Sequence, residues 1–172
     1  MHITRPATVR STAKRLLRAK SRYQAIQQAT GVPWYMVAAI HERESGQNWS
    51  RSLAQGDRWD RVSVHVPRGR GPFKSWEEAA ADALATLKGL HRITDWRLEK
   101  ILYQLERYNG WGYFWRGLGS PYLWGATNIQ QRGKFIADGR FSPSAWDVQL
   151  GCAAMIRDLM TLDPSIKPVR ES

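Results

Sequence analysis

The sequence predicts a mainly α-helical protein of the α+β class, with a small β-hairpin among its helices. Apolar residues recur at helical spacing over most of the chain. One segment, residues 47–74, is rich in turn residues and alternates in part like a strand. The length of 172 residues and the hydrophobic content of 42% are typical of one globular domain. We therefore expect residues 1–172 to form a single domain, in which helices and a hairpin can border a cleft.

The first expected helix spans about residues 8–28, and it is basic. Its apolar face would consist of Ala13, Leu16, Leu17, Tyr23 and Ile26. Gly31 is expected to break this helix. A second helix would begin at Pro33, which suits a first helical turn, and run to about Ser45, where Gly46 ends it.

Residues 47–74 contain five turn-forming residues, namely Gly56, Pro67, Gly69, Gly71 and Pro72. Between them, residues 61–66 read Arg-Val-Ser-Val-His-Val, an alternation that predicts a short strand of a β-hairpin beside a loop. Ser75 and Glu78 form a capping-box pattern for a third helix to about Leu90.

Two further helices are expected in the second half of the chain. Thr94 or Asp95 can cap the first of them, in which the leucines and isoleucine at positions 98, 101, 102 and 105 repeat at helical spacing. Residues 109–144 are rich in glycine and aromatics, which predicts at most short helices. The last helix would span about residues 145–162, with Val148, Cys152, Met155 and Leu159 on one side. Cys152 is the single cysteine, so no disulfide can form within the chain.

The net charge of +11 and the pI of about 10.3 favour polyanionic partners. Candidates are nucleic acid, anionic lipid or lipopolysaccharide, and the peptide carboxylates of a cell wall. No acidic residue precedes Glu42, whereas basic residues crowd the start of the chain: Arg5, Arg10, Lys14, Arg15, Arg18, Lys20 and Arg22. This run is either a solvated helix face or a surface that draws the protein to an anionic envelope. The N-terminus lacks the apolar core of a Sec signal, so we expect synthesis in a cytoplasm without a Sec export route.

Glu44 is the strongest candidate for chemistry. It lies at the end of the second expected helix, one turn after Ile40 and close to the apolar residues Trp34 and Val37. Apolar walls disfavour the charged form of a carboxyl group, so the pKa of Glu44 is expected to rise, as a general acid requires. From spacing alone, a surface glutamate in a run with Glu42 is the commoner explanation.

The resemblance of several motifs to known families changes that balance. Ile40-x-x-x-Glu44-Ser45-Gly46 resembles the Glu-Ser-Gly signature of goose-type lysozymes and soluble lytic transglycosylases. Residues 107–112, RYNGWG, resemble their second signature, Ala-Tyr-Asn-x-Gly, in the expected order. The segments VPWYMVAAIHERESGQN, HVPRGRGP, YNGWGY, SPYLWG and FIADGRF together resemble phage and prophage endolysins of the lysozyme family, over roughly residues 30–160. The resemblance implies a lysozyme-like helical domain whose hairpin flanks the active-site cleft.

The same resemblance implies roles for single residues. Glu44 would be the acid that protonates the glycosidic oxygen, with Glu42 a weaker candidate. Gly56-Asp57 resembles the Gly-Asp of the endolysins, so Asp57 is preferred to Asp60 as the base that an inverting hydrolase needs. Ser63 resembles the hydroxyl residue that orients water in phage-type lysozymes. A turn-capping Asp57 and a solvated Ser63 are equally open, since this chain has Gly-Asp-Arg-Trp where relatives often have Gly-Asp-Pro-Leu.

Five residues are expected to bind the sugar: Tyr108, Asn109, Trp111, Tyr122 and Trp124. Flat aromatic faces stack on the apolar faces of sugar rings, although core packing is an equal alternative for a tryptophan in a loop. His41-Glu42 begins like the zinc motif His-Glu-x-x-His, but position 45 is Ser. We expect no metal and no cofactor, because hydrolysis by carboxylates needs neither.

The resulting prediction is a monomeric glycoside hydrolase, a muramidase-type endolysin. It would wait in the host cytoplasm until a partner opens the inner membrane, then cut peptidoglycan glycan strands in the periplasm and release phage by lysis. A lytic transglycosylase remains an alternative, although the Gly-Leu-Met-Gln segment of that class is absent. A basic nucleic-acid-binding protein and an inactive wall-binding module are the alternatives from other classes. No helix-turn-helix, zinc-finger or RNA-recognition signature supports nucleic-acid binding.

Overall fold

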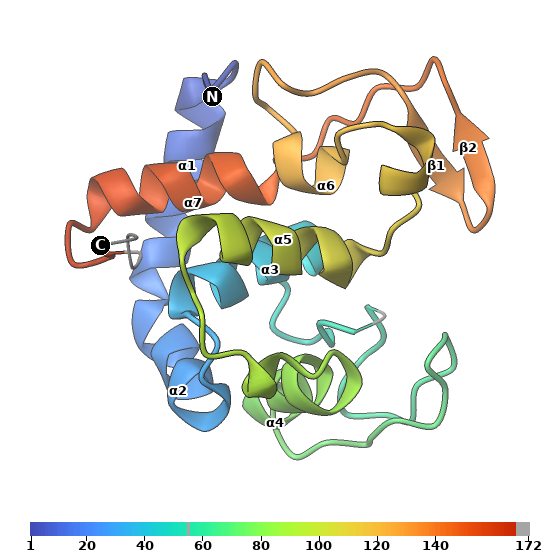
Figure 1. Cartoon of the computed structure of the whole chain (residues 1–172). Coiled ribbons are helices and arrows are strands. Elements are labelled where there is room, and N and C mark those ends of the chain that lie inside the picture. The colour runs from blue at the N-terminus through green and yellow to red at the C-terminus, as the bar shows by residue number, and fades with distance from the viewer. Residues whose placement is uncertain (55, 168–172) are drawn as a thin grey trace. The chain divides into compact units, whose positions relative to one another are not determined.

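The computed structural model describes residues 1–54 and 56–167, and it confirms a mainly helical fold with one small antiparallel hairpin (Figure 1). The chain divides into two compact units. Unit 1 consists of Met1–Lys14 and Leu98–Lys167, and the described part of unit 2 is Arg15–Arg97 without residue 55. The single domain expected from the length stays a prediction. Within the described residues, no helix combines the length and the apolar character needed to cross a membrane.

Unit 2 contains most of the helices of the first half of the chain. They are α2 (Lys20–Thr30), α3 (Trp34–Ser45), α4 (Trp76–Ala81), the π-helical η1 (Asp82–Leu87) and the 3-10 turn η2 (Leu90–Arg92). α1 (Pro6–Arg18) begins in unit 1 and ends in unit 2. The expected continuous helix over residues 8–28 is therefore wrong. The helix is interrupted at Ala19, although no glycine or proline lies beside it in the sequence. The interruption arises because α2 packs against α3 and α4.

The α3 helix forms the centre of unit 2. All its residues from Trp34 to His41 are buried, so it is surrounded by other elements on every side. Gly31 and Gly46 adopt left-handed conformations, with φ of 78° and 63°, and cap α2 and α3 as the sequence predicts. The capping interaction at α4 is also confirmed, since the Ser75 hydroxyl accepts a hydrogen bond from the Glu78 amide.

The expected strand over residues 61–66 does not form. The described residues of 47–74 contain a single isolated bridge, between Arg51 and Arg58, and the valines of the alternating segment point outward. Val62, Val64 and Val66 are 54%, 68% and 79% exposed, whereas Ser63 between them is buried. Because the outward positions are the apolar ones, the alternation does not mark a face packed on the core.

Unit 1 contains the hairpin and the remaining helices. The elements are α5 (Leu98–Asn109), η3 (Phe114–Arg116), α6 (Pro121–Trp124), β1 (Lys134–Ala137), β2 (Arg140–Ser142) and α7 (Cys152–Leu162). β1 and β2 pair antiparallel, with Phe135 opposite Phe141. The Asp138-Gly139 pair turns the chain between them, and Gly139 has a φ of 69°. The hairpin thus lies about 70 residues beyond its expected place.

The last helix begins at Cys152 and not near position 145. The cause is a close crossing of two backbone segments at Gly151 and Gly125, whose amide and carbonyl are hydrogen-bonded at 2.9 Å. A Cβ atom on Gly151 would lie 2.3 Å from the Gly125 nitrogen, so only glycine fits. Val148, expected on the apolar face of this helix, is outside it and exposed, and so is Trp146, whereas Cys152 is buried.

Candidate active site

Glu44 lies in the last turn of α3, in unit 2, and its side chain is partly buried. One turn earlier stand Ile40 and His41, which are both fully buried. After Glu44, the chain turns sharply: the Gly46 amide donates to the Glu42 carbonyl, and the Gln47 amide donates to the His41 carbonyl. Glu44 thus lies at the end of a helix, and the helical turn before it is buried in the core.

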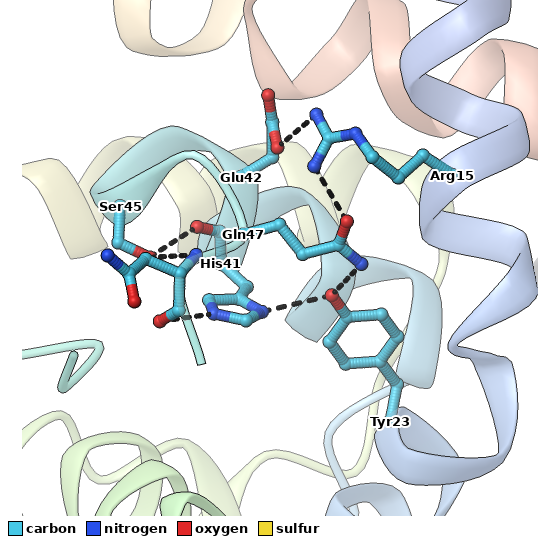
Figure 2. Close-up of polar contacts among 7 residues, drawn as sticks. Arg15, Tyr23, His41, Glu42, Ser45 and Gln47 are labelled. Carbon is cyan, nitrogen blue, oxygen red and sulfur yellow. Dashed lines mark hydrogen bonds and ion pairs between the residues drawn. The ribbon is translucent and has the colours of Figure 1, made fainter. Parts of the chain in front are cut away.

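A chain of polar side chains holds this end of α3 (Figure 2). Arg15 donates one hydrogen bond to Glu42 at 2.8 Å and another to the Gln47 amide oxygen at 2.6 Å. The Gln47 amide nitrogen donates in turn to the Tyr23 hydroxyl at 2.9 Å, and this hydroxyl lies 3.0 Å from His41 Nδ1. The network joins α1, α2 and α3, so it fixes the helix end on which Glu44 stands.

The protonation of His41 follows from its partners. Its Nε2 lies 3.1 Å from the Asn48 carbonyl oxygen, which can only accept, so Nε2 carries the hydrogen atom. Nδ1 then accepts the proton of the Tyr23 hydroxyl. Burial lowers the pKa of His41 from 6.5 to about 4, which keeps the ring neutral, and burial also raises the pKa of Tyr23. His41 is therefore a structural residue of the core.

Glu42 and Glu44 have different surroundings, although they are two residues apart. Successive residues of an α-helix are rotated by about 100°, so the two side chains leave α3 on nearly opposite sides. Glu42 forms the ion pair with Arg15, and its side chain is largely shielded. The choice of Glu44 rather than Glu42 as the acid stays a prediction from the motifs.

Four rings pack together beneath this network. The His41 ring lies 4.5 Å from the Trp49 ring and 4.6 Å from the Trp76 ring, measured between centroids, and Tyr23 stacks on Trp49 at 5.4 Å. The Arg22 guanidinium lies 3.9 Å above Trp49. The Trp49 ring is thus in contact with Tyr23, His41, Trp76 and Arg22.

Asp57 anchors the loop that follows it. One carboxylate oxygen accepts from the amides of Val64 and His65 at 3.0 and 2.9 Å, and the other lies 2.5 Å from His65 Nδ1. These hydrogen bonds, the backbone amide of His65 first among them, lower the pKa of Asp57. The carboxylate is charged at neutral pH, and both of its oxygens have partners. Asp60, the second candidate base, is exposed and pairs with Arg58 at 2.5 Å.

The hydroxyl of Ser63 forms hydrogen bonds within the same loop. It donates to the Pro67 carbonyl at 2.9 Å and accepts from the Arg70 amide at 2.9 Å. The Ser63 amide donates to the Arg70 carbonyl, so the two residues close the loop from both sides. Because this hydroxyl is buried and its proton is engaged, the geometry gives it a structural role, and its expected orientation of water stays a prediction.

Hydrogen bonds connect the loop to the segment that follows α3. The Ser52 amide donates to the Asp57 carbonyl at 2.7 Å, and the Trp59 indole donates to the Trp49 carbonyl at 2.7 Å. Residues 57–59 therefore run beside residues 49–52. Glu44, Asp57 and Ser63 all belong to unit 2.

The five expected sugar-binding residues belong to unit 1. Tyr108, on α5, and Tyr122, on α6, are 5% and 4% exposed, so neither ring presents a face on which a sugar could stack. Asn109 is exposed, and its amide lies 3.3 Å from the Ser120 hydroxyl. Trp111 is partly exposed and packs against Tyr103 and Phe114.

Trp124 lines an apolar pocket of about 480 Å³ within unit 1. Its other lining residues come from the chain start, α5, α7 and the segment after α6: Met1, Leu98, Leu102, Ile129, Ala153, Ile156, Arg157 and Met160. The pocket is lined almost entirely by aliphatic side chains, whereas sugar sites combine aromatic faces with several polar groups. Sugar binding by Trp124 stays a prediction.

Sequence reasoning missed an exposed aromatic surface and a half-buried carboxyl group. Tyr103, Phe114 and Trp115 are all more than half exposed, and their rings form a continuous row through Trp111. The run Phe114-Trp115 in a glycine-rich segment was the available signal. Glu106, on α5, is half-buried, and this burial raises its pKa.

Comparisons with protein-family models, curated proteins and solved structures give no match to this chain. Among the described residues, no three His, Cys, Asp or Glu side chains gather closely enough to hold a metal ion. The candidate site therefore rests on the geometry around Glu44 and on the motifs of the sequence.

Proposed function

We propose that this protein is a glycoside hydrolase that cleaves the glycan strands of bacterial peptidoglycan, with Glu44 as the general acid. The observation that carries the proposal is the placing of Glu44, partly buried, one turn after fully buried residues and on a helix end held by the Arg15–Gln47–Tyr23–His41 network. A rigid support is what a proton donor needs, since proton transfer depends on its position relative to the leaving oxygen.

In the proposed reaction Glu44 donates its proton to the oxygen that bridges two sugars, and the bond between that oxygen and the anomeric carbon breaks. Asp57 is the proposed base. It takes a proton from a water molecule, whose oxygen bonds to the anomeric carbon on the opposite face. The products are two shorter strands, one with a new reducing end. The lowered pKa of Asp57 ensures the charged form that a base requires.

A lytic transglycosylase is the second candidate, and the hydrogen bonds of Asp57 favour it. A carboxylate that already accepts from two amides and one imidazole is a weakened base. In the alternative reaction Glu44 alone serves twice. It first protonates the bridging oxygen and then takes the proton of the substrate's own 6-hydroxyl, whose oxygen bonds to the anomeric carbon and closes an anhydro ring.

The direct test compares Glu44→Gln with Glu42→Gln, two isosteric changes on one helical turn. We expect Glu44→Gln to lower the rate of turbidity loss of permeabilised Gram-negative cells by roughly 10²–10⁴-fold, the usual contribution of a general acid. Glu42→Gln should retain activity within severalfold, because it removes only the Arg15 pair. If Glu44→Gln folds normally and lyses cells at the wild-type rate, the proposal is wrong.

Mass spectrometry of digested peptidoglycan separates the candidate reactions. Reducing N-acetylmuramic acid ends indicate a muramidase, anhydro ends a transglycosylase, and reducing N-acetylglucosamine ends a glucosaminidase. Asp57→Asn sharpens the result, because a hydrolase that uses Asp57 as base should lose kcat with it, whereas a transglycosylase should keep its kcat and change at most in KM through the loop that Asp57 anchors.

The basic N-terminal segment is the proposed contact to an anionic envelope, although part of its charge is engaged. Arg10 pairs with Asp158, Arg15 with Glu42 and Arg22 with Glu77. Lys14 and Arg18 are exposed on α1. The double change Lys14→Gln and Arg18→Gln leaves the apolar face of α1 intact and should slow lysis at low salt only. The same variant tests the nucleic-acid alternative, which requires salt-sensitive binding of DNA.

Release of phage by host lysis, after a partner opens the inner membrane, is proposed from the motifs alone. In that setting the protein would act in the periplasm as a monomer. No metal or cofactor enters the proposed reaction.

A further inference from the structure

The loop formed by residues 61–70, here called the cationic loop, presents charge that the proposed reaction does not use. Residues 57–74 contain five arginines and lysines but only two acidic residues, Asp57 and Asp60. Asp57 is held by His65, Asp60 pairs with Arg58, and Arg70 pairs with Asp82 on η1, which leaves Arg61 and Arg68 to carry the excess charge of the loop. Arg61 and Arg68 are exposed within the loop. The loop therefore carries a local excess of positive charge at the surface of unit 2.

This loop has a fixed shape. Ser63 and Arg70 are joined by two hydrogen bonds, and the Gly69 amide donates to the Ser63 carbonyl at 3.1 Å. In the middle of the loop, the amides of Val64 and His65 donate to the Asp57 carboxylate. Since each anchor lies inside the loop or at its base, the exposed guanidinium groups stand on a frame that does not need to order when a ligand binds.

The surface between the two arginines is apolar. Val62, Val64 and Val66 are all more than half exposed and lie at alternate positions between Arg61 and Arg68. Three exposed valines in five residues, bordered by positive charge, are typical of a contact surface rather than of a solvated loop. Such a surface suits a ligand that combines small apolar side chains with carboxylates, which a nucleic-acid backbone does not.

We propose that the cationic loop binds the acidic peptide stems of peptidoglycan, with Arg61 and Arg68 pairing with stem carboxylates and the valines contacting alanine methyl groups. This inference rests on the proposed function, since it names the part of the same substrate that the loop recognises. The loop is continuous with the Glu44 segment through the hydrogen bonds between residues 49–52 and 57–59. The enzyme would therefore prefer glycan strands that still carry their peptides.

The first test measures peptide binding without catalysis. A fluorescently labelled stem tetrapeptide is titrated with the full-length wild-type protein and with the Arg61→Ala/Arg68→Ala double variant at low ionic strength. The wild type should bind the free-acid peptide more tightly than the same peptide with amidated carboxylates. The double variant should lose about fivefold in affinity for the free-acid form, as expected for two exposed ion pairs. Arg140→Ala, an exposed arginine on β2, is the matched control and should bind as the wild type does.

The second test measures cleavage of glycan strands with stems and of strands from which an amidase has removed them. The double variant should raise KM about fivefold on the stem-bearing strands, with kcat within twofold and no change on bare strands. Equal losses on both substrates, unchanged binding of the tetrapeptide, or equal binding of the free-acid and amidated peptides by the wild type would each overturn the inference. Salt-sensitive DNA binding that the same variant abolishes, without peptide binding, would also overturn it. Peptide binding without any glycan cleavage by the wild type would instead keep the inference and reject the proposed function.

Discussion

The end of α3 and the cationic loop both belong to unit 2, yet they are stabilised by different means. The α3 end is held mainly by hydrogen bonds among the buried groups His41, Tyr23 and Gln47, with the Arg15–Glu42 ion pair at the edge of the network. The loop is held by the Asp57 carboxylate, by a buried serine hydroxyl and by the Arg70–Asp82 ion pair, while most of its other side chains face solvent. Buried networks lose stability when a partner is removed, whereas a surface anchor restrains only its own segment. The support of Glu44 should therefore be global and that of the loop local.

The largest effect is expected at His41. The change His41→Ala removes the partner of the Tyr23 hydroxyl and of the Asn48 carbonyl and leaves a cavity among Trp49 and Trp76. We expect the free energy of unfolding to fall by about 4 kcal/mol. Urea unfolding measures this free energy. The control is His91→Ala, at an exposed histidine, which should lower it by less than about 0.5 kcal/mol. A similar small loss at both positions would show that the network does not support the helix end.

The second effect is a dependence of stability on pH. His41 has a pKa of about 4 in the folded protein against 6.5 in an unfolded chain, so the unfolded chain binds the additional proton. The stabilisation is complete above pH 6.5 and is lost as the pH falls toward 4, by about 3 kcal/mol in total. Urea midpoints at several pH values should show this slope in the wild type and not in His41→Gln. If His41→Gln shows the same slope, other titrating groups cause the pH dependence and the prediction for His41 is wrong.

The two regions also differ in how far the sequence determines them. The α3 helix could be predicted because Gly31, Pro33 and Gly46 mark its ends locally. The loop could not, because Asp57 bonds to amides seven and eight residues away and leaves the valines outside. The observed hairpin did carry a local signal, Asp138-Gly139 between two phenylalanines, whereas the start of α7 depends on the contact of Gly151 with Gly125.

The same limit applies to the candidate site. Glu44 could be chosen from motifs, whereas the ion pair of Glu42 could not be foreseen, because its partner Arg15 lies on another helix, 27 residues earlier in the chain. Side-chain burial could not be foreseen for Tyr108 and Tyr122, because it depends on the packing of α5 and α6 against other parts of unit 1.

The third effect is local and concerns Asp57. Asp57→Asn removes the charge that the lowered pKa reflects and keeps a single acceptor oxygen for the two amides and the imidazole. We expect trypsin to cleave after Arg61 and Arg68 roughly tenfold faster, because the loop opens more often. Asp60→Asn, in the same segment, should change the rate less than about twofold, since its pair with Arg58 is exposed. Equal rates in both variants would mean that the loop does not depend on the Asp57 carboxylate.

The smallest effect tests the direction of neighbouring side chains in the loop. Ser63→Ala removes a buried hydroxyl that donates to Pro67 and accepts from Arg70, and it should lower the free energy of unfolding by about 1 kcal/mol. Val64→Ser replaces a valine that is 68% exposed and should change it by less than about 0.5 kcal/mol. An inward strand would give the reverse order, with the valine costly and the serine neutral. Thermal or urea unfolding of the two variants therefore decides which face of the segment is buried, because polarity alone would favour the opposite result.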